Sequence, residues 1–203
     1  FLNSRIITIV GIDAIAIRIS FTGDLGWEIY VPIDQQLKLY EALLNTGIDL
    51  KVSPVGSRSL LSLRVEKGYG SWGREYSPEY WPHEVGLDHL IKLEKPNFLG
   101  RNIYVELNRK PAREKLVMLE VITDLGADPV GGEPIFLEDG TPVGQVKSGA
   151  YSYTCKKSLA LSMIKSDYAS VQETFDVAVV GRKTQAIMLA KPPFDPEGNR
   201  LRS

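Results

Sequence analysis

The spacing of apolar residues changes near residue 111 of this 203-residue sequence. Before that point, Ile- and Val-rich stretches alternate with stretches whose apolar residues recur every three or four positions, which is typical of strands and helices in turn. After it, apolar residues recur at every second position in several short segments, which is typical of strands with one buried face. The pattern predicts an α+β part, residues 1–110, followed by an all-β part, residues 111–203.

The α+β part begins with predicted strands. Within the apolar run 6–21, residues 14–19 are rich in Ile and Ala and are predicted as a strand, and residues 28–31 are predicted as another. Gly23 and Gly26 lie between the two strands. Because glycine tolerates the backbone angles of tight turns, we expect a hairpin here.

Three helices are expected after this hairpin. Residues 34–44 carry Leu and Tyr at helical spacing, with Asp34 near the N-terminus and Gly47 as the stop. Further helices are predicted over residues 57–67 and 99–108. The aromatic stretch between them, residues 69–81, has no steady period and is predicted as an ordered loop.

The all-β part follows a basic, polar stretch, residues 108–113, which is the predicted linker. Six short strands are expected, joined by short turns, and residues 138–141 carry the turn signal of a hairpin. From periodicity alone, a small barrel and a sandwich both remain open. The six predicted strands are residues 116–121, 133–137, 143–148, 158–164, 175–180 and 184–190.

Composition and charge exclude several classes of function. Hydrophobic residues make up 43% and charged residues 24%, so a globular core is expected. A net charge of −1 without a basic stripe gives no argument for a nucleic-acid partner. No apolar run is long enough for a membrane span. His83 and His89 have no matching ligand cluster, so no metal site is predicted.

The single cysteine and the first residue bear on the cellular context. Cys155 cannot form an intrachain disulfide, which favours a reducing compartment, either the bacterial cytoplasm or the mitochondrial matrix. We interpret Cys155 as a structural thiol. The chain begins at Phe1, directly before an apolar run and without a targeting pattern, so we expect a piece of a longer polypeptide.

Five short motifs follow one another along the chain. The run 21–28 reads Phe-Thr-Gly-Asp-Leu-Gly-Trp-Glu, and the next motif reads Ser-Leu-Arg-Val-Glu-Lys-Gly. Each motif alone is weak, but the order of all five resembles the folate-binding module of the aminomethyltransferase family, which includes the glycine-cleavage T-protein and the dimethylglycine and sarcosine dehydrogenases. The five motifs are residues 21–28, 62–68, 82–87, 98–101 and 143–149.

Two stretches resemble the dehydrogenase branch of this family. Residues 66–73 are similar to the Glu-Lys-aromatic stretch of those enzymes, and residues 148–160 are similar to their barrel motif. Leu60 stands where the glycine-cleavage enzyme has an arginine, so the sequence departs from that branch here.

The resemblance implies a fold, a cofactor and an activity. The fold is a partial aminomethyltransferase folate-binding fold with a C-terminal small β-barrel. The cofactor is tetrahydrofolate, which captures the one-carbon unit of an N-methyl amine as methylenetetrahydrofolate. FAD is expected only in an upstream domain, and the family's acid/base aspartate is expected upstream of Phe1, so no catalytic residue is assigned here. The expected partners are folate, the amine-derived iminium and the upstream segments.

Glu28 is the first predicted folate ligand. It matches the family glutamate that holds the pteridine, and an ionised carboxylate can accept two parallel N–H groups. The alternative is an ordinary surface glutamate on a strand. Phe21 stands where relatives commonly have Tyr; it can border the pteridine or serve as a core aromatic.

Arg64, Tyr69 and Trp72 complete the predicted cofactor-binding set. Arg64 can approach an anionic group of folate, or form an ion pair on a helix surface. Tyr69 and Trp72 can line the p-aminobenzoyl part of folate, or pack parts of the protein together. Two rival functions stay open: a fragment of a glycine-cleavage aminomethyltransferase, and a non-catalytic module that kept the fold.

Overall fold

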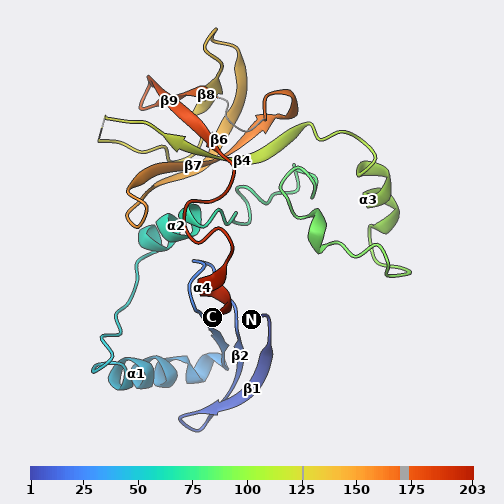
Figure 1. Cartoon of the computed structure of the whole chain (residues 1–203). Coiled ribbons are helices and arrows are strands. Elements are labelled where there is room, and N and C mark those ends of the chain that lie inside the picture. The colour runs from blue at the N-terminus through green and yellow to red at the C-terminus, as the bar shows by residue number, and fades with distance from the viewer. Residues whose placement is uncertain (125, 170–173) are drawn as a thin grey trace. The chain divides into compact units, whose positions relative to one another are not determined.

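The computed structural model describes residues 1–124, 126–169 and 174–203, which form two compact units (Figure 1). Unit 1 comprises residues 1–64 and 195–203, and unit 2 comprises residues 65–194. The predicted division into 1–110 and 111–203 concerns domains rather than these compact units, and it stays a prediction.

Unit 1 contains a three-stranded antiparallel sheet. Its order is β1 (Ser4–Ile9), β2 (Ile12–Ile17) and β3 (Glu28–Tyr30). The predicted hairpin across the two glycines is confirmed, because Ile17 lies opposite Glu28. The sequence prediction missed β1, which pairs with β2 through a turn at residues 10–11.

Helix α1 (Gln36–Thr46) follows a 3₁₀ turn, Ile33–Gln35. The predicted stop at Gly47 is confirmed, but Asp34 does not cap the helix. Its carboxylate accepts a hydrogen bond from the Gln35 amide, and Gln35 itself is the N-cap residue, without a side-chain cap. Within α1 only Leu39 is buried, so most of the apolar side chains on this helix remain accessible in the structure.

Helix α2 (Ser57–Glu66) is close to its predicted bounds, and its last turn is attached to the barrel. Glu66 is 1% exposed, and its carboxylate accepts hydrogen bonds from the Ser152 hydroxyl at 2.5 Å and the Thr154 hydroxyl at 2.9 Å. Gly68 follows with a φ of +75°, and a Cβ there would lie 2.7 Å from Pro192. This turn therefore requires glycine.

The segment between α2 and the barrel holds the predicted aromatic loop and α3 (Arg101–Leu107). Residues 69–81 form turns with one isolated bridge between Trp72 and Tyr76, so the loop prediction is confirmed. A Cβ on Gly70 would lie 2.5 Å from the Tyr76 ring, so the ring packs against bare backbone.

Glu84 joins this segment to the first barrel strand. Its carboxylate has no exposed surface and accepts hydrogen bonds from the backbone N–H groups of Trp81 and Arg113 and from the Arg113 guanidinium, at 2.7–2.9 Å. The Arg113 guanidinium also lies 4.2 Å from the centre of the Trp81 ring. Burial alone would raise the pKa of Glu84, but these hydrogen bonds and the Arg113 charge lower it to about 2.

Unit 2 is built on a closed barrel of six strands, so the choice between barrel and sandwich is resolved (Figure 1). The strand order is β4-β7-β6-β5-β8-β9, and all pairs are antiparallel. The predicted turn at residues 138–141 joins two neighbouring strands. The six strands are β4 (Glu114–Val121), β5 (Pro134–Phe136), β6 (Pro142–Ser152), β7 (Lys157–Lys165), β8 (Thr174–Val179) and β9 (Arg182–Leu189).

The barrel interior is the main hydrophobic core of unit 2. It is filled by aliphatic side chains and one phenylalanine, with a bulge in β6 between Val146 and Ser148. These side chains come from all six strands, which explains why closure buries them. The core residues are Leu119, Val121, Ile135, Val143, Val146, Ala160, Ile164, Phe175, Val177, Val179, Ala186 and Met188.

Candidate functional site

One face of the three-stranded sheet in unit 1 is open and carries Glu28. Residues directly opposite each other on paired strands share a face. Ile6, Ile15 and Tyr30 form one such row across the three strands. Ile17 and Glu28 are paired in the neighbouring row on the same face. Ile6 is 82% exposed and Tyr30 is 52% exposed, so this face is an accessible apolar surface with a carboxylate at its edge.

Glu28 and Tyr30 interact on this face. They are two residues apart on β3, and the Tyr30 hydroxyl donates a hydrogen bond to the Glu28 carboxylate. This bond, with the nearby negative charge, raises the pKa of Tyr30 above its usual value. The phenol therefore stays protonated and keeps its hydrogen bond to the carboxylate over the physiological pH range.

The Glu28 side chain is exposed in the structure, and its role as a pteridine ligand stays a prediction. The physical reason for this exposure is its place in the sheet. It lies on the short third strand at the edge, and the face that it shares with Ile15 and Tyr30 is open. The carboxylate is thus accessible to a ligand from the open side.

The turn before β3 is fixed by several contacts. A Cβ on Gly26 would lie 2.8 Å from Ser20 and 2.9 Å from the Ile19 carbonyl, so only glycine fits. The buried Arg18 donates to the Gly26 carbonyl at 3.2 Å. Asp24 forms an ion pair with Arg200 of the C-terminal helix α4 (Asn199–Arg202) at 2.9 Å. The turn therefore presents β3 in one defined position.

The remaining predicted site residues have different surroundings. Phe21 is 40% exposed at the start of the turn, so it is not a core aromatic. Arg64 is fully buried, which contradicts the alternative of an ion pair on a helix surface. The structure therefore brings Phe21 and Glu28 onto one hairpin, and it shows Arg64 away from solvent.

Tyr69 and Trp72 lie in the aromatic loop of unit 2. Tyr69 is half-buried, with the Lys67 ammonium 5.9 Å from its ring centre, whereas Trp72 is 80% exposed. An indole this exposed makes few packing contacts within unit 2 and is available to a ligand or to another segment. The role of both residues in folate binding stays a prediction.

Tyr30 was not among the predicted site residues. The period of two along a strand places residues 28 and 30 on the same face, and this signal was present in the sequence. The attachment of Glu66 to Ser152 and Thr154 had no such signal, because it joins residues far apart in the chain.

No described helix has the length and hydrophobicity needed to cross a membrane. Among the residues that the structure describes, no group of three His, Cys, Asp or Glu side chains is arranged to hold a metal ion.

Comparison with known proteins identifies the family. The profile of the GCVT N-terminal domain matches residues 1–95, and the profile of the glycine cleavage T-protein C-terminal barrel domain matches residues 114–195. Together the two profiles cover most of the chain in the expected order. The chain therefore belongs to the aminomethyltransferase, or glycine-cleavage T-protein, family.

Relatives come from both branches of this family. The chain is 34% identical to the mitochondrial dimethylglycine dehydrogenase of Homo sapiens over 99% of its own length, but it spans only 23% of that enzyme. It is 30% identical to the aminomethyltransferase of Thermoanaerobacter pseudethanolicus, over 91% of its own length and 50% of that protein.

A solved structure confirms the fold. The aminomethyltransferase T of the glycine cleavage system from Bartonella henselae superposes with a TM-score of 0.82 at 24% identity. The match covers 90% of this chain and 50% of that structure. The chain thus has part of the aminomethyltransferase fold, including its barrel.

Proposed function

We propose that this chain supplies part of a tetrahydrofolate site to an N-methyl amine dehydrogenase of the dimethylglycine or sarcosine type. In this proposal the chain is the C-terminal portion of a longer polypeptide, and a flavin domain elsewhere oxidises the amine. The length comparison supports this arrangement, because the chain spans about a quarter of the human dehydrogenase.

The open face of the sheet is the observation that carries the proposal. A pteridine is a flat ring with an edge of N–H donors, and an accessible carboxylate beside apolar side chains suits such a ligand. Glu28 accepts two N–H groups of the ring edge, and Ile15 and Ile17 provide the apolar surface below. Tyr30 holds the Glu28 carboxylate through its hydrogen bond, which restricts the rotation of that side chain.

The group held by these residues would be tetrahydrofolate, which would supply the acceptor for the one-carbon unit. The residues of this chain bind and orient it. Phe21 borders the ring from the start of the hairpin, whereas contact of Tyr69 and Trp72 with the p-aminobenzoyl part stays a prediction from the family resemblance. Arg64 is fully buried, and its contact with an anionic group of the folate stays a prediction from the family resemblance.

Tetrahydrofolate titration tests this proposal in the natural protein that contains the chain. We expect saturable binding by calorimetry under anaerobic conditions, and release of formaldehyde from dimethylglycine or sarcosine that falls when tetrahydrofolate is added. A well-folded protein that does not bind reduced folate contradicts the proposal and supports a non-catalytic module instead.

A glycine-cleavage aminomethyltransferase is the second candidate function. It is favoured by the 30% identity to the aminomethyltransferase of Thermoanaerobacter pseudethanolicus, of which the chain spans half. The two candidates differ in flavin content and in the reaction that they catalyse. A dehydrogenase purifies with flavin and demethylates an N-methyl amine, whereas the transferase has no flavin and releases ammonia from a lipoyl-bound aminomethyl group in the presence of tetrahydrofolate.

A further inference from the structure

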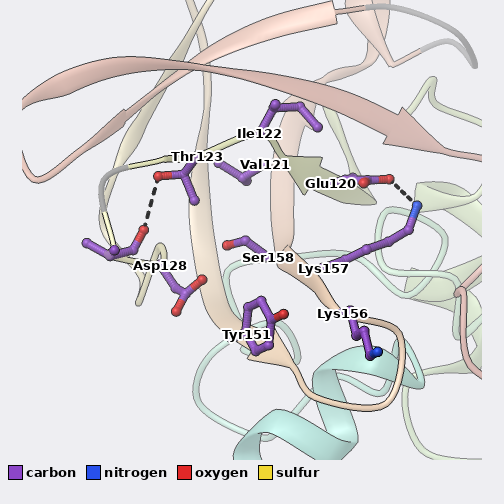
Figure 2. A pocket seen from close by; sticks show the side chains of 11 residues that line it. Glu120, Val121, Ile122, Thr123, Asp128, Tyr151, Lys156, Lys157 and Ser158 are labelled. Atoms are coloured by element: carbon purple, nitrogen blue, oxygen red, sulfur yellow. Dashed lines mark hydrogen bonds and ion pairs between the residues drawn. The ribbon is translucent and has the colours of Figure 1, made fainter.

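A polar cavity of ≈ 510 Å³ lies in unit 2, where β4 ends beside the hairpin that joins β6 to β7 (Figure 2). It shares no residue with the candidate folate surface. Its size falls in the range of small-molecule sites, but its lining is more polar than such sites usually are. The polar side chains that line it are Glu120, Thr123, Asp128, Tyr151, Lys156, Lys157 and Ser158.

Ser158 is the most unusual of these residues. It is 6% exposed, and its hydroxyl has no hydrogen-bond partner among the residues that the structure describes. In the barrel it lies between the core residue Val121 on one side and the cavity-lining Tyr151 on the other. A buried hydroxyl without a partner is costly, and a polar group in the cavity would restore the missing bond.

The charges around the cavity are balanced. Glu120 and Lys157 form an ion pair at 2.6 Å, which neutralises both groups. Asp128 and Lys156 also line the cavity, and neither forms an ion pair with a described residue. Two carboxylates in the cavity would repel a strongly anionic ligand, and two ammonium groups would repel a polycation.

Figure 2 shows how these groups are distributed. The Ser158 hydroxyl points to the side of the cavity that carries Asp128, and the Glu120–Lys157 pair lies on the other side. A ligand with one positive and one negative group matches this arrangement better than a ligand of a single sign.

We propose that this cavity binds a small zwitterion with one ammonium and one carboxylate on a short aliphatic chain. The ammonium faces Asp128 and donates a hydrogen bond to the Ser158 hydroxyl. The carboxylate faces Lys156, and the Tyr151 ring covers the aliphatic part. The proposal does not depend on folate binding, because the two sites have no residue in common.

Three four-carbon probes test the charge requirement on the full 203-residue chain: γ-aminobutyrate, succinate and putrescine. We expect γ-aminobutyrate to shift the amide resonances around residues 120–123 and 156–158 in a saturable way. The affinity for succinate and for putrescine should be lower by a factor of about ten or more, because each probe replaces one favourable charge with an unfavourable one. Equal shifts with all three probes, or no shift with γ-aminobutyrate, would overturn the proposal.

Single variants then locate the binding groups. Lys156→Gln and Asp128→Asn should each weaken γ-aminobutyrate binding about threefold to tenfold, and Ser158→Ala should weaken it as well. Ser162→Ala is the matched control, because Ser162 is also a buried β7 hydroxyl without a described partner but does not line the cavity. If Ser158→Ala does not fold, the Lys156 and Asp128 variants still test the proposal. Unchanged affinity in both of them would contradict the proposal.

Discussion

The Tyr30 hydroxyl donates a hydrogen bond to the Glu28 carboxylate on the open face of the sheet in unit 1. This contact joins Glu28, a predicted ligand within the family motif 21–28, to Tyr30, which lies outside that motif. Because both side chains lie on one strand, two positions apart, the pair is held by local backbone geometry alone. It is therefore expected to form whenever β3 pairs with β2.

Replacing Glu28 should change how Tyr30 titrates. The carboxylate accepts the phenol proton and repels the phenolate, and both effects raise the pKa of Tyr30. Glu28→Gln removes the charge, so the pKa of Tyr30 should fall toward its usual value of 10.0. Ultraviolet or NMR titration of tyrosine measures this change, with the exposed Tyr40 on α1 as an internal reference. An unchanged Tyr30 curve would show that the two side chains do not interact in solution.

Tyr30→Phe should weaken tetrahydrofolate binding without unfolding the protein. The variant keeps the ring on the sheet but leaves Glu28 without its hydrogen bond, so affinity should fall about threefold to tenfold. Calorimetry measures the affinity, and thermal unfolding checks that the exposed position tolerates the change. Tyr40→Phe, on the exposed side of α1, should leave affinity unchanged.

The buried Glu84 should make the free energy of unfolding depend on pH in the acid range. Its pKa is lowered from 4.5 to about 2 in the folded protein, so the folded state favours the ionised form. The stabilisation is therefore complete above about pH 4.5 and is lost as pH falls toward 2. It amounts to about 3 kcal/mol, since each unit of pKa shift corresponds to about 1.4 kcal/mol.

Urea unfolding of Glu84→Gln measures this contribution. The variant should be about 3 kcal/mol less stable at neutral pH, and the difference from the natural sequence should shrink below about pH 4. Glu106→Gln is the control, because its ion pair with Lys110 is exposed and spans 3.6 Å, so it should cost less than about 0.5 kcal/mol. A difference that persists unchanged at low pH would exclude ionisation of Glu84 as the cause.

Two hairpin turns contain valine in a left-handed conformation, which β-branched residues disfavour. Val10 has a φ of +52° and precedes Gly11, and Val180 has a φ of +48° and precedes Gly181. Asparagine accepts this conformation more easily, so Val10→Asn and Val180→Asn should each stabilise the protein by about 1 kcal/mol. Val130→Asn is the control, since Val130 is also exposed but has no positive φ. An equal gain at Val130 would indicate a general surface effect.

The attachment of α2 to the barrel can be tested at two hydroxyls. Ser152 is 1% exposed and Thr154 is exposed, although both donate to Glu66. Ser152→Ala should cost about 1–3 kcal/mol, because it leaves a buried carboxylate oxygen without its donor. Thr154→Val should cost less, since water can replace that hydroxyl. Chemical denaturation of the two variants gives the comparison, and equal costs would contradict a buried Glu66.

The sequence predicted most elements because their local signals agreed with the final fold. In β8 the buried residues Phe175, Val177 and Val179 recur at every second position, as the period of two predicted, and Gly47 ends α1 as expected. The strand β1 was missed because its turn, Val10-Gly11, carries valine where asparagine or aspartate would mark a hairpin. Local sequence gave no sign of the left-handed valine, because pairing of β1 with β2 imposes it.

The candidate site was predictable only in part. The family motif indicated Glu28, but the exposure of that side chain depends on what packs on the sheet, which no local pattern encodes. Arg64 illustrates the same limit in reverse, because an arginine is typical of a helix surface and yet this one is fully buried. Tertiary packing decided both outcomes.

The affinity of the Glu28→Gln variant for tetrahydrofolate tests the central claim most directly. Glutamine keeps the size of the side chain but turns one acceptor into a donor, so binding to the natural protein should weaken by about 1–3 kcal/mol. Glu41→Gln, at an exposed position on α1, is the matched control and should bind as the natural sequence does. Unchanged affinity in Glu28→Gln, or an equal loss in Glu41→Gln, would contradict a pteridine site on this face of the sheet.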